Sequence, residues 1–162
     1  MTILDDAIGL EERARTYYAE AAERVTDPSG KKILTLLVNE EKRHAELLGK
    51  MKDGLHGELA DSPLLQDVRG LVEGAVKEGK NAISSDGTLR EILQKAMEIE
   101  QATKQFYEEK AASADDDKVK DLFTKLAKQE TSHYLLVSSL AEYFDRPAEW
   151  VESAEFGLRP EY

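Results

Sequence analysis

The sequence predicts an all-α fold, a four-helix bundle made of two helix pairs, with a long crossover between helices 2 and 3 that contains a short helix. Apolar residues recur about every 3.6 positions through four long segments, and only four prolines stand in the 162 residues. The second half also repeats the first, since residues 7–49 align without a gap on residues 96–138, with twelve of 43 positions identical. Each half should therefore fold as an antiparallel helix pair, because the connection inside each half is short.

The first pair has clear start and stop signals. Thr2 and Asp5 have the spacing of a capping box, which opens a helix over 3–26. The dipeptide Asp27-Pro28 ends that helix and starts the next, with the aspartate as N-cap and the proline at the first helical position. Apolar residues then continue at helical spacing to about residue 53.

The crossover and the second pair follow the same logic. Residues 54–63 are rich in turn-forming residues, and 64–76 form a shorter amphipathic pattern that predicts the helix inside the crossover. The third long helix is expected over 88–113. A run of three aspartates, 115–117, supplies an N-cap and favourable negative charge for the fourth helix, which should extend to about residue 144.

We therefore expect one bundle domain over 1–146, followed by a tail over 147–162. The tail holds the only tryptophan, Trp150, and ends in Tyr162. These aromatic residues are expected to cover apolar surface on the bundle or on a dimer partner.

Composition argues against several classes of function. The net charge of −11 disfavours nucleic acid as a partner, because nucleic-acid binding requires a basic patch. The same acidity suits a well-solvated surface or a field that attracts cations. No apolar run has the length of a membrane span, and the N-terminus lacks the pattern of a secretion signal. Without cysteine the chain has no thiol chemistry or disulfide, so a cytoplasmic protein is expected.

The candidate site is a motif that occurs twice. Glu41 and His44 form one Glu-x-x-His, and Glu130 and His133 form the other. A glutamate precedes each motif by 30 residues, Glu11 in the first half and Glu100 in the second. Each Glu-x-x-His spans one helical turn, so both of its side chains can face the bundle interior.

Four glutamates buried together require compensation, either by protons or by cations. Two divalent ions would balance four carboxylates, while two neutral imidazoles add nitrogen ligands without changing the charge. Oxygen ligands with imidazole suit iron or manganese, and zinc is another candidate. A single Glu-x-x-His is weak evidence for a metal. Six such residues recurring in register predict a two-metal site made of Glu11, Glu41, His44, Glu100, Glu130 and His133.

Neighbouring polar residues are weaker candidates for metal ligands. Glu40 could replace Glu41 as a ligand, but its counterpart in the repeat is Gln129, which favours Glu41. Glu12 matches Gln101 and is expected to face solvent, and His56 is expected in an exposed loop.

Two tyrosines stand seven residues after the first glutamate of each half, Tyr18 after Glu11 and Tyr107 after Glu100. They could hydrogen-bond ligating carboxylates or simply pack in the core.

With these motifs, E-x6-Y twice, EEKRH and ETSH, the sequence resembles the rubrerythrin branch of the ferritin-like superfamily. The resemblance covers the four-helix portion and implies a non-haem di-iron centre with two iron ions per chain. It also implies reduction of hydrogen peroxide or O₂, or oxidation of Fe(II), and a homodimer. Tyr18 and Tyr107 would then tune the carboxylates or donate protons.

Two departures from the family pattern limit this expectation. Full rubrerythrins carry a rubredoxin-like domain with four cysteines, and this chain has no cysteine, so electrons would come from a separate donor protein or from Fe(II). Rubrerythrins also usually carry an extra glutamate one turn after the third-helix ligand, where this chain has Thr103 and Lys104.

Two other functional interpretations fit the same residues. The protein could bind metal for sequestration or delivery without turnover, or it could be a structural bundle whose site has lost its role. The complete set of six ligand-type residues argues against the last of these.

Overall fold

Helices make up the regular structure of the described residues, which the computed structural model gives as 2–77 and 87–145. The all-α prediction is confirmed, and each predicted helix ends within two residues of its observed end. The predicted tail, with Trp150 and Tyr162, lies outside the described residues. The helices are α1 (Ile3–Arg24), α2 (Pro28–Lys52), α3 (Leu64–Lys77), α4 (Gly87–Ser113) and α5 (Asp117–Asp145).

The predicted caps are present at three helix starts. Thr2 and Asp5 form the capping box of α1, with the Asp5 amide donating to Thr2 Oγ1 over 3.2 Å. Asp27 caps α2 by accepting from the Gly30 amide at 2.7 Å. Within the aspartate run, Asp116 accepts from the first backbone amides of α5. These local contacts explain why the helices begin where the sequence predicts.

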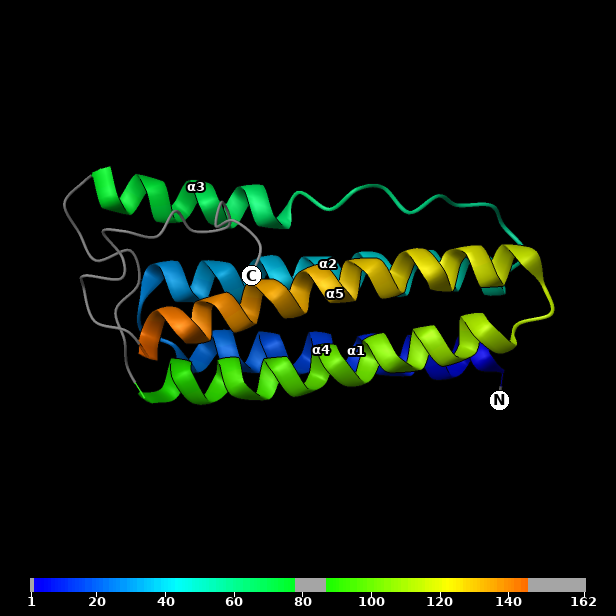
Figure 1. Ribbon diagram of the computed structural model, residues 1–162, viewed down its shortest axis with the longest axis horizontal. Coiled ribbons are helices and arrows are strands. Elements are labelled where there is room, and N and C mark those ends of the chain that lie inside the picture. The colour runs from blue at the N-terminus through cyan, green and yellow to red at the C-terminus, as the bar shows by residue number, and fades with distance from the viewer. Residues whose placement is uncertain (1, 78–86, 146–162) are drawn as a thin grey trace.

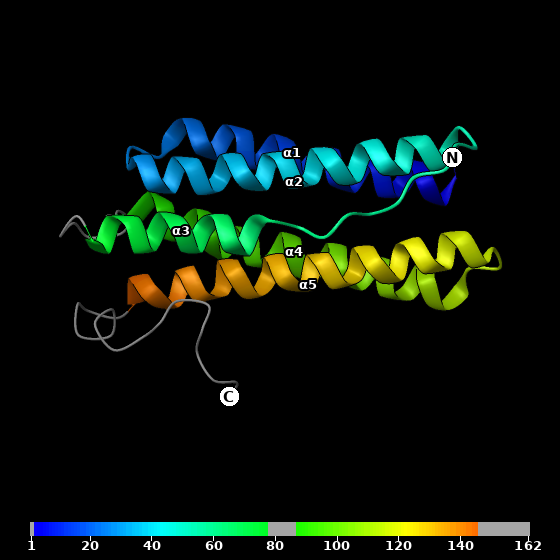
Figure 2. The same ribbon diagram turned by 90° about the horizontal axis from the view of Figure 1, so that it is seen from above.

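The bundle is assembled from two antiparallel pairs, as the repeat predicts. α1 packs along α2 and α4 along α5, and α1 also touches α4 between the pairs. Figure 1 shows the crossover leaving the end of α2 and running along the bundle as far as α3. α3 then lies over the face that α2 and α5 form, as the view from above shows (Figure 2). None of the helices in the described ranges has an apolar stretch long enough to cross a bilayer.

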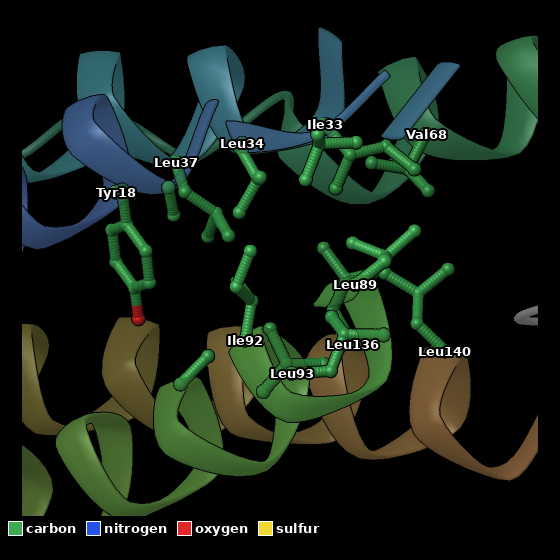
Figure 3. Close-up of a cluster of buried hydrophobic side chains, with 14 of the residues drawn as sticks. Tyr18, Ile33, Leu34, Leu37, Val68, Leu89, Ile92, Leu93, Leu136 and Leu140 are labelled. Carbon is green, nitrogen blue, oxygen red and sulfur yellow. The ribbon is translucent and has the colours of Figure 1, made fainter. Parts of the chain in front are cut away.

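The buried apolar side chains form two clusters, one toward each end of the bundle. One contains Leu34, Leu37, Ile92, Leu93 and Leu140, with Val68 of α3 packed onto it (Figure 3). The other is built around Leu48, Phe123 and Leu126. Along each long helix the buried residues between the two clusters are polar, apart from Ala45 on α2. The fold therefore places one polar layer in the middle of an otherwise apolar interior.

Two glycines of α2 allow a matched test of the packing. A Cβ atom at Gly30 would lie 3.0 Å from Leu89 Cδ2 and 3.1 Å from Val25 Cγ1, and both neighbours are buried. A Cβ atom at Gly49 would meet nothing within 4 Å. Gly30→Ala should lower the free energy of unfolding by about 1 kcal/mol, since overpacking outweighs the gain in helix propensity. Gly49→Ala should raise it by about 0.5–1 kcal/mol.

Thermal unfolding followed by circular dichroism measures both effects. For a chain of this size each kcal/mol shifts the unfolding temperature by about 2–4 °C. The same upward shift in both variants would contradict the close contact at Gly30.

Candidate metal centre

The six predicted ligand residues meet in the polar layer between the two apolar clusters. Every one of them is at most 1% exposed. α1 and α4 contribute one glutamate each, and α2 and α5 contribute one Glu-x-x-His each. The members are Glu11, Glu41, His44, Glu100, Glu130 and His133. The three-residue spacing directs both side chains of each motif inward, because residues one turn apart share a helix face.

Each imidazole turns its Nδ1 atom toward the carboxylates. His44 Nδ1 lies 3.0 Å from Glu130 Oε1 and 3.4 Å from Glu11 Oε1. His133 Nδ1 lies 3.3 Å from Glu41 Oε1, 3.4 Å from Glu130 Oε2 and 3.5 Å from Glu100 Oε2. The two rings are parallel, with centroids 5.6 Å apart.

These side chains form two overlapping groups, each able to hold one ion. One group is Glu11, Glu41, His44 and Glu130, and the other is Glu41, Glu100, Glu130 and His133. The candidate ligand atoms within a group lie within 4.8 Å of one another. Glu41 and Glu130 belong to both groups, as expected for carboxylates that bridge two ions. The structure brings all six residues together, and their role as metal ligands stays a prediction.

The hydrogen bonding of this layer fits a bound metal pair. Buried oxygen atoms without a hydrogen-bond partner occur on Glu11, Glu41, Glu100 and Glu130, and His133 Nδ1 likewise makes no hydrogen bond. Buried polar atoms are rarely left without a partner, because desolvation costs free energy that only a hydrogen bond or an ion repays. Carboxylate oxygens and imidazole nitrogens are the donor set of non-haem iron and manganese.

Without metal, protons must balance the charge of this layer. Burial and the facing carboxylates Glu130 and Glu11 raise the pKa of Glu41 well above its usual range. Burial and the charges of Glu11 and Glu100 raise the pKa of Glu130 to about 8. Both shifts favour the protonated form of the two carboxylates that the groups share.

The histidines and the remaining glutamates form ion pairs. Burial alone would lower the pKa of His44, but the carboxylates of Glu11 and Glu130 outweigh burial and raise it to about 10. Burial would likewise lower the pKa of His133, but the charge of Glu100 outweighs the effect of burial and raises that pKa well above its usual value. In return, the His44 charge overcomes burial and lowers the pKa of Glu11 to about 2. Burial alone would raise the pKa of Glu100, but its contacts with Glu130 and His133 outweigh burial and lower that pKa.

The two tyrosines both donate hydrogen bonds to carboxylates of the layer and pack in the core. Tyr18 donates its hydroxyl to Glu100 Oε1 at 2.5 Å, and Tyr107 donates to Glu11 Oε1. Each therefore supports the glutamate of the other helix pair rather than the one on its own helix. Their rings are fully buried in the two apolar clusters.

Three polar side chains behind the imidazoles were not predicted to matter. Glu40, which the sequence set aside as a ligand, is 5% exposed, and its Oε2 lies 3.2 Å from His133 Nε2. Gln129 Oε1 lies 2.8 Å from His44 Nε2. Arg43 donates to both of these acceptors at 2.8 Å. The available signal was the repeat itself, since Glu40 and Gln129 occupy equivalent positions just before the two motif glutamates.

The position one turn after Glu100 carries no carboxylate. Thr103 is buried there, and its hydroxyl donates to the Ile99 carbonyl of its own helix at 2.9 Å. Lys104 lies 3.8 Å from Glu108 in an ion pair on α4. The site therefore contains the six predicted residues without the extra glutamate of the family pattern.

Two other polar residues occupy their expected surroundings. His56 is exposed in the crossover. Glu12 is partly exposed and pairs with Arg15 on the same helix. Neither takes part in the buried layer.

Comparison with known families agrees with this arrangement. The family model described as Rubrerythrin matches residues 2–141. No curated protein and no solved structure matches the chain. The matched residues include every member of the buried Glu/His layer, and family and layer together indicate a metal-binding site. The chain therefore belongs to the rubrerythrin family.

Proposed function

We propose that this protein is a non-haem di-iron oxidoreductase that reduces hydrogen peroxide or O₂, oxidises Fe(II), or does both. The observation that carries the proposal is the sharing of Glu41 and Glu130 between two ligand groups, each with one histidine. Glu41 and Glu130 would bridge the ions. Glu11 with His44 and Glu100 with His133 would complete one position each. Iron is the proposed metal, and manganese or zinc would fit the same donors.

Bound iron would supply the electron transfer, while the protein supplies positioning and protons. Reduction of peroxide to two waters consumes two electrons and two protons. The hydroxyls of Tyr18 and Tyr107 donate hydrogen bonds to Glu100 and Glu11, so they can pass protons to the buried layer. A pocket of about 330 Å³, lined in part by Ser62, Gln129, Ser132 and His133, adjoins the layer at His133, and a small oxidant would approach from this side.

The remaining parts of the proposal concern partners and location. Because the chain has no cysteine, electrons would come from a separate donor protein or from Fe(II) itself. The acidic surface disfavours nucleic acid and suits capture of Fe(II). We propose a cytoplasmic homodimer, in which exposed Leu65 and Leu135 would be covered by the partner.

A second candidate function is storage or delivery of metal without turnover. The observation that favours it is Thr103, whose hydroxyl bonds to its own helix where rubrerythrins carry an extra ligating glutamate. Without that carboxylate the centre has one set of ligands for both redox states. Such a centre could hold iron without cycling it efficiently.

Metal content and anaerobic Fe(II) titration test the proposal. Protein purified without chelator should bind close to two irons per chain, and peroxide should then oxidise both, seen as ferric absorption. His133→Ala should lose this stoichiometry, while His56→Ala, which changes the exposed histidine of the crossover, should keep it.

Continuous turnover separates the two candidates. Repeated consumption of peroxide in the presence of a reductant supports the oxidoreductase. Stoichiometric binding followed by a single oxidation, with no further peroxide consumed, supports storage. No uptake of iron, manganese or zinc would overturn the metal centre itself.

A further inference from the structure

The outer faces of the two imidazoles differ in one chemical respect. His44 Nε2 faces the amide oxygen of Gln129 at 2.8 Å, and His133 Nε2 faces a carboxylate oxygen of Glu40 at 3.2 Å. Arg43 Nη2 donates to both acceptors at 2.8 Å, so the same cation lies beside each of them. On the outer side of the rings, the difference in charge is therefore a carboxylate behind His133 and a neutral amide behind His44.

These contacts also determine which nitrogen of each ring is available to a metal. Gln129 Nε2 donates to the Ala60 carbonyl at 2.8 Å, so its oxygen must be the atom that faces His44 and Arg43. An oxygen that faces Nε2 can only accept, which makes Nε2 the protonated nitrogen. The same reasoning applies to His133, because Glu40 Oε2 is an acceptor. Nδ1 of both rings is therefore the nitrogen that can ligate metal, and it is the one that points inward.

We infer that Glu40 makes the two metal positions unequal, so that the position formed by Glu100 and His133 binds a divalent ion more tightly than the position formed by Glu11 and His44. This inference rests on the proposed metal centre. A carboxylate is a stronger acceptor than an amide, so it draws the Nε2 proton more strongly and makes the opposite nitrogen a better donor. Glu40 acts through His133 and is a positioning residue. Outer hydrogen-bond partners of this kind change metal affinity by roughly 10–100-fold.

One alternative use of Glu40 is disfavoured by its contacts. Glu40, His44 and His133 also lie close enough to hold an ion on the outer side of the rings. The Arg43 guanidinium already occupies that side, 2.8 Å from Glu40 Oε2. Both Nε2 atoms are engaged with acceptors there, so neither offers a lone pair. A cation on this side would have to displace the arginine, which leaves the outer-partner role for Glu40.

Titration of the metal-free protein with Co²⁺, followed by calorimetry and by the visible absorption of the bound ion, tests the inference. The unmodified protein should bind two ions in steps whose dissociation constants differ by roughly 10–100-fold. Glu100→Gln should remove the tighter step, and Glu11→Gln the weaker one. Glu40→Gln keeps the shape and the hydrogen bond but removes the charge, so the tighter step should weaken until the two merge.

Glu12→Gln is the matched control, because it makes the same change beside the ligand Glu11 on a side chain that contacts Arg15 and neither histidine. Its titration should keep two separate steps. Equal steps in the unmodified protein, or steps that stay separate in Glu40→Gln, would overturn the inference while leaving a two-metal centre. Equal weakening of both steps by Glu40→Gln would also overturn it. Absence of any Co²⁺ uptake would overturn the metal centre as well.

Discussion

Loading this protein with two divalent ions should raise its unfolding temperature by at least about 8–16 °C. This range counts the stabilisation from a single bound ion. A ligand present at 1,000 times its dissociation constant adds about 4 kcal/mol of stability when it binds only the folded state. In a chain of this size each kcal/mol is worth about 2–4 °C. The effect should be large because the ions would replace protons among buried carboxylates that have unpaired oxygens.

Glu41→Gln isolates the contribution of the metal from that of the fold. The raised pKa of Glu41 keeps its side chain neutral in the metal-free protein, so a neutral amide of the same shape should change the metal-free unfolding temperature little. The amide cannot bridge two ions as a carboxylate does, so most of the metal-induced rise should be lost. Glu46→Gln is the control, since Glu46 lies on the same helix with an exposed side chain.

Scanning calorimetry with and without Fe²⁺ under anaerobic conditions, or with Co²⁺, measures these shifts. An equal rise in Glu41→Gln and in the unmodified protein would show that the stabilising ions bind elsewhere.

Binding of two divalent ions near pH 7 should release about four protons, one from each of four side chains that are protonated without metal. Glu41 and Glu130 carry protons because burial and neighbouring carboxylates raise their pKa values. His44 and His133 each carry a second proton because carboxylates face them. Ligation requires all four to give up a proton. The charge of the layer then stays balanced, since four positive charges enter and four leave.

The same groups determine how the stability of the metal-free protein depends on pH. The pKa of Glu130 rises from 4.5 to about 8 on folding, and that of His44 from 6.5 to about 10. The folded state therefore binds more protons than the unfolded state across this range, and stability should fall as pH rises from about 4.5 to about 10. Glu11 acts in the opposite sense, because its pKa falls from 4.5 to about 2, so stability should also fall as pH drops through that interval.

Proton release is measured by titrating metal into protein in two buffers of different ionisation enthalpy. The difference in heat gives the number of protons, and denaturant unfolding at several pH values tests the stability trend. Glu46→Gln should leave both results unchanged, because that side chain is exposed. Release of only about two protons for two bound ions, the number that the histidines alone would supply, would contradict the protonation of the shared glutamates.

Much of this centre could be predicted from the sequence, because its signals are local or repeated. Glu41 and His44 share a helix face because they are three residues apart, and this holds whatever the helix packs against. Asp27 caps α2 through a contact three residues away. The repeat then indicates which of many glutamates matter, since Glu11, Glu41, Glu100 and Glu130 recur in register. Helix order, pairing and the six candidate ligands follow from such patterns.

What only the tertiary structure decided are contacts between the two helix pairs. Tyr18 reaches Glu100, 82 residues away, although a glutamate of the same kind lies on its own helix. Glu40 differs from Gln129 in sequence, and that difference argued against any role until the fold placed both behind the imidazoles. Periodicity tells which side of a helix is buried, but not which atoms meet across the interface. These contacts depend on how the two helix pairs pack against each other. They also depend on the crossover, whose Ala60 carbonyl accepts a hydrogen bond from Gln129 and so orients its side chain.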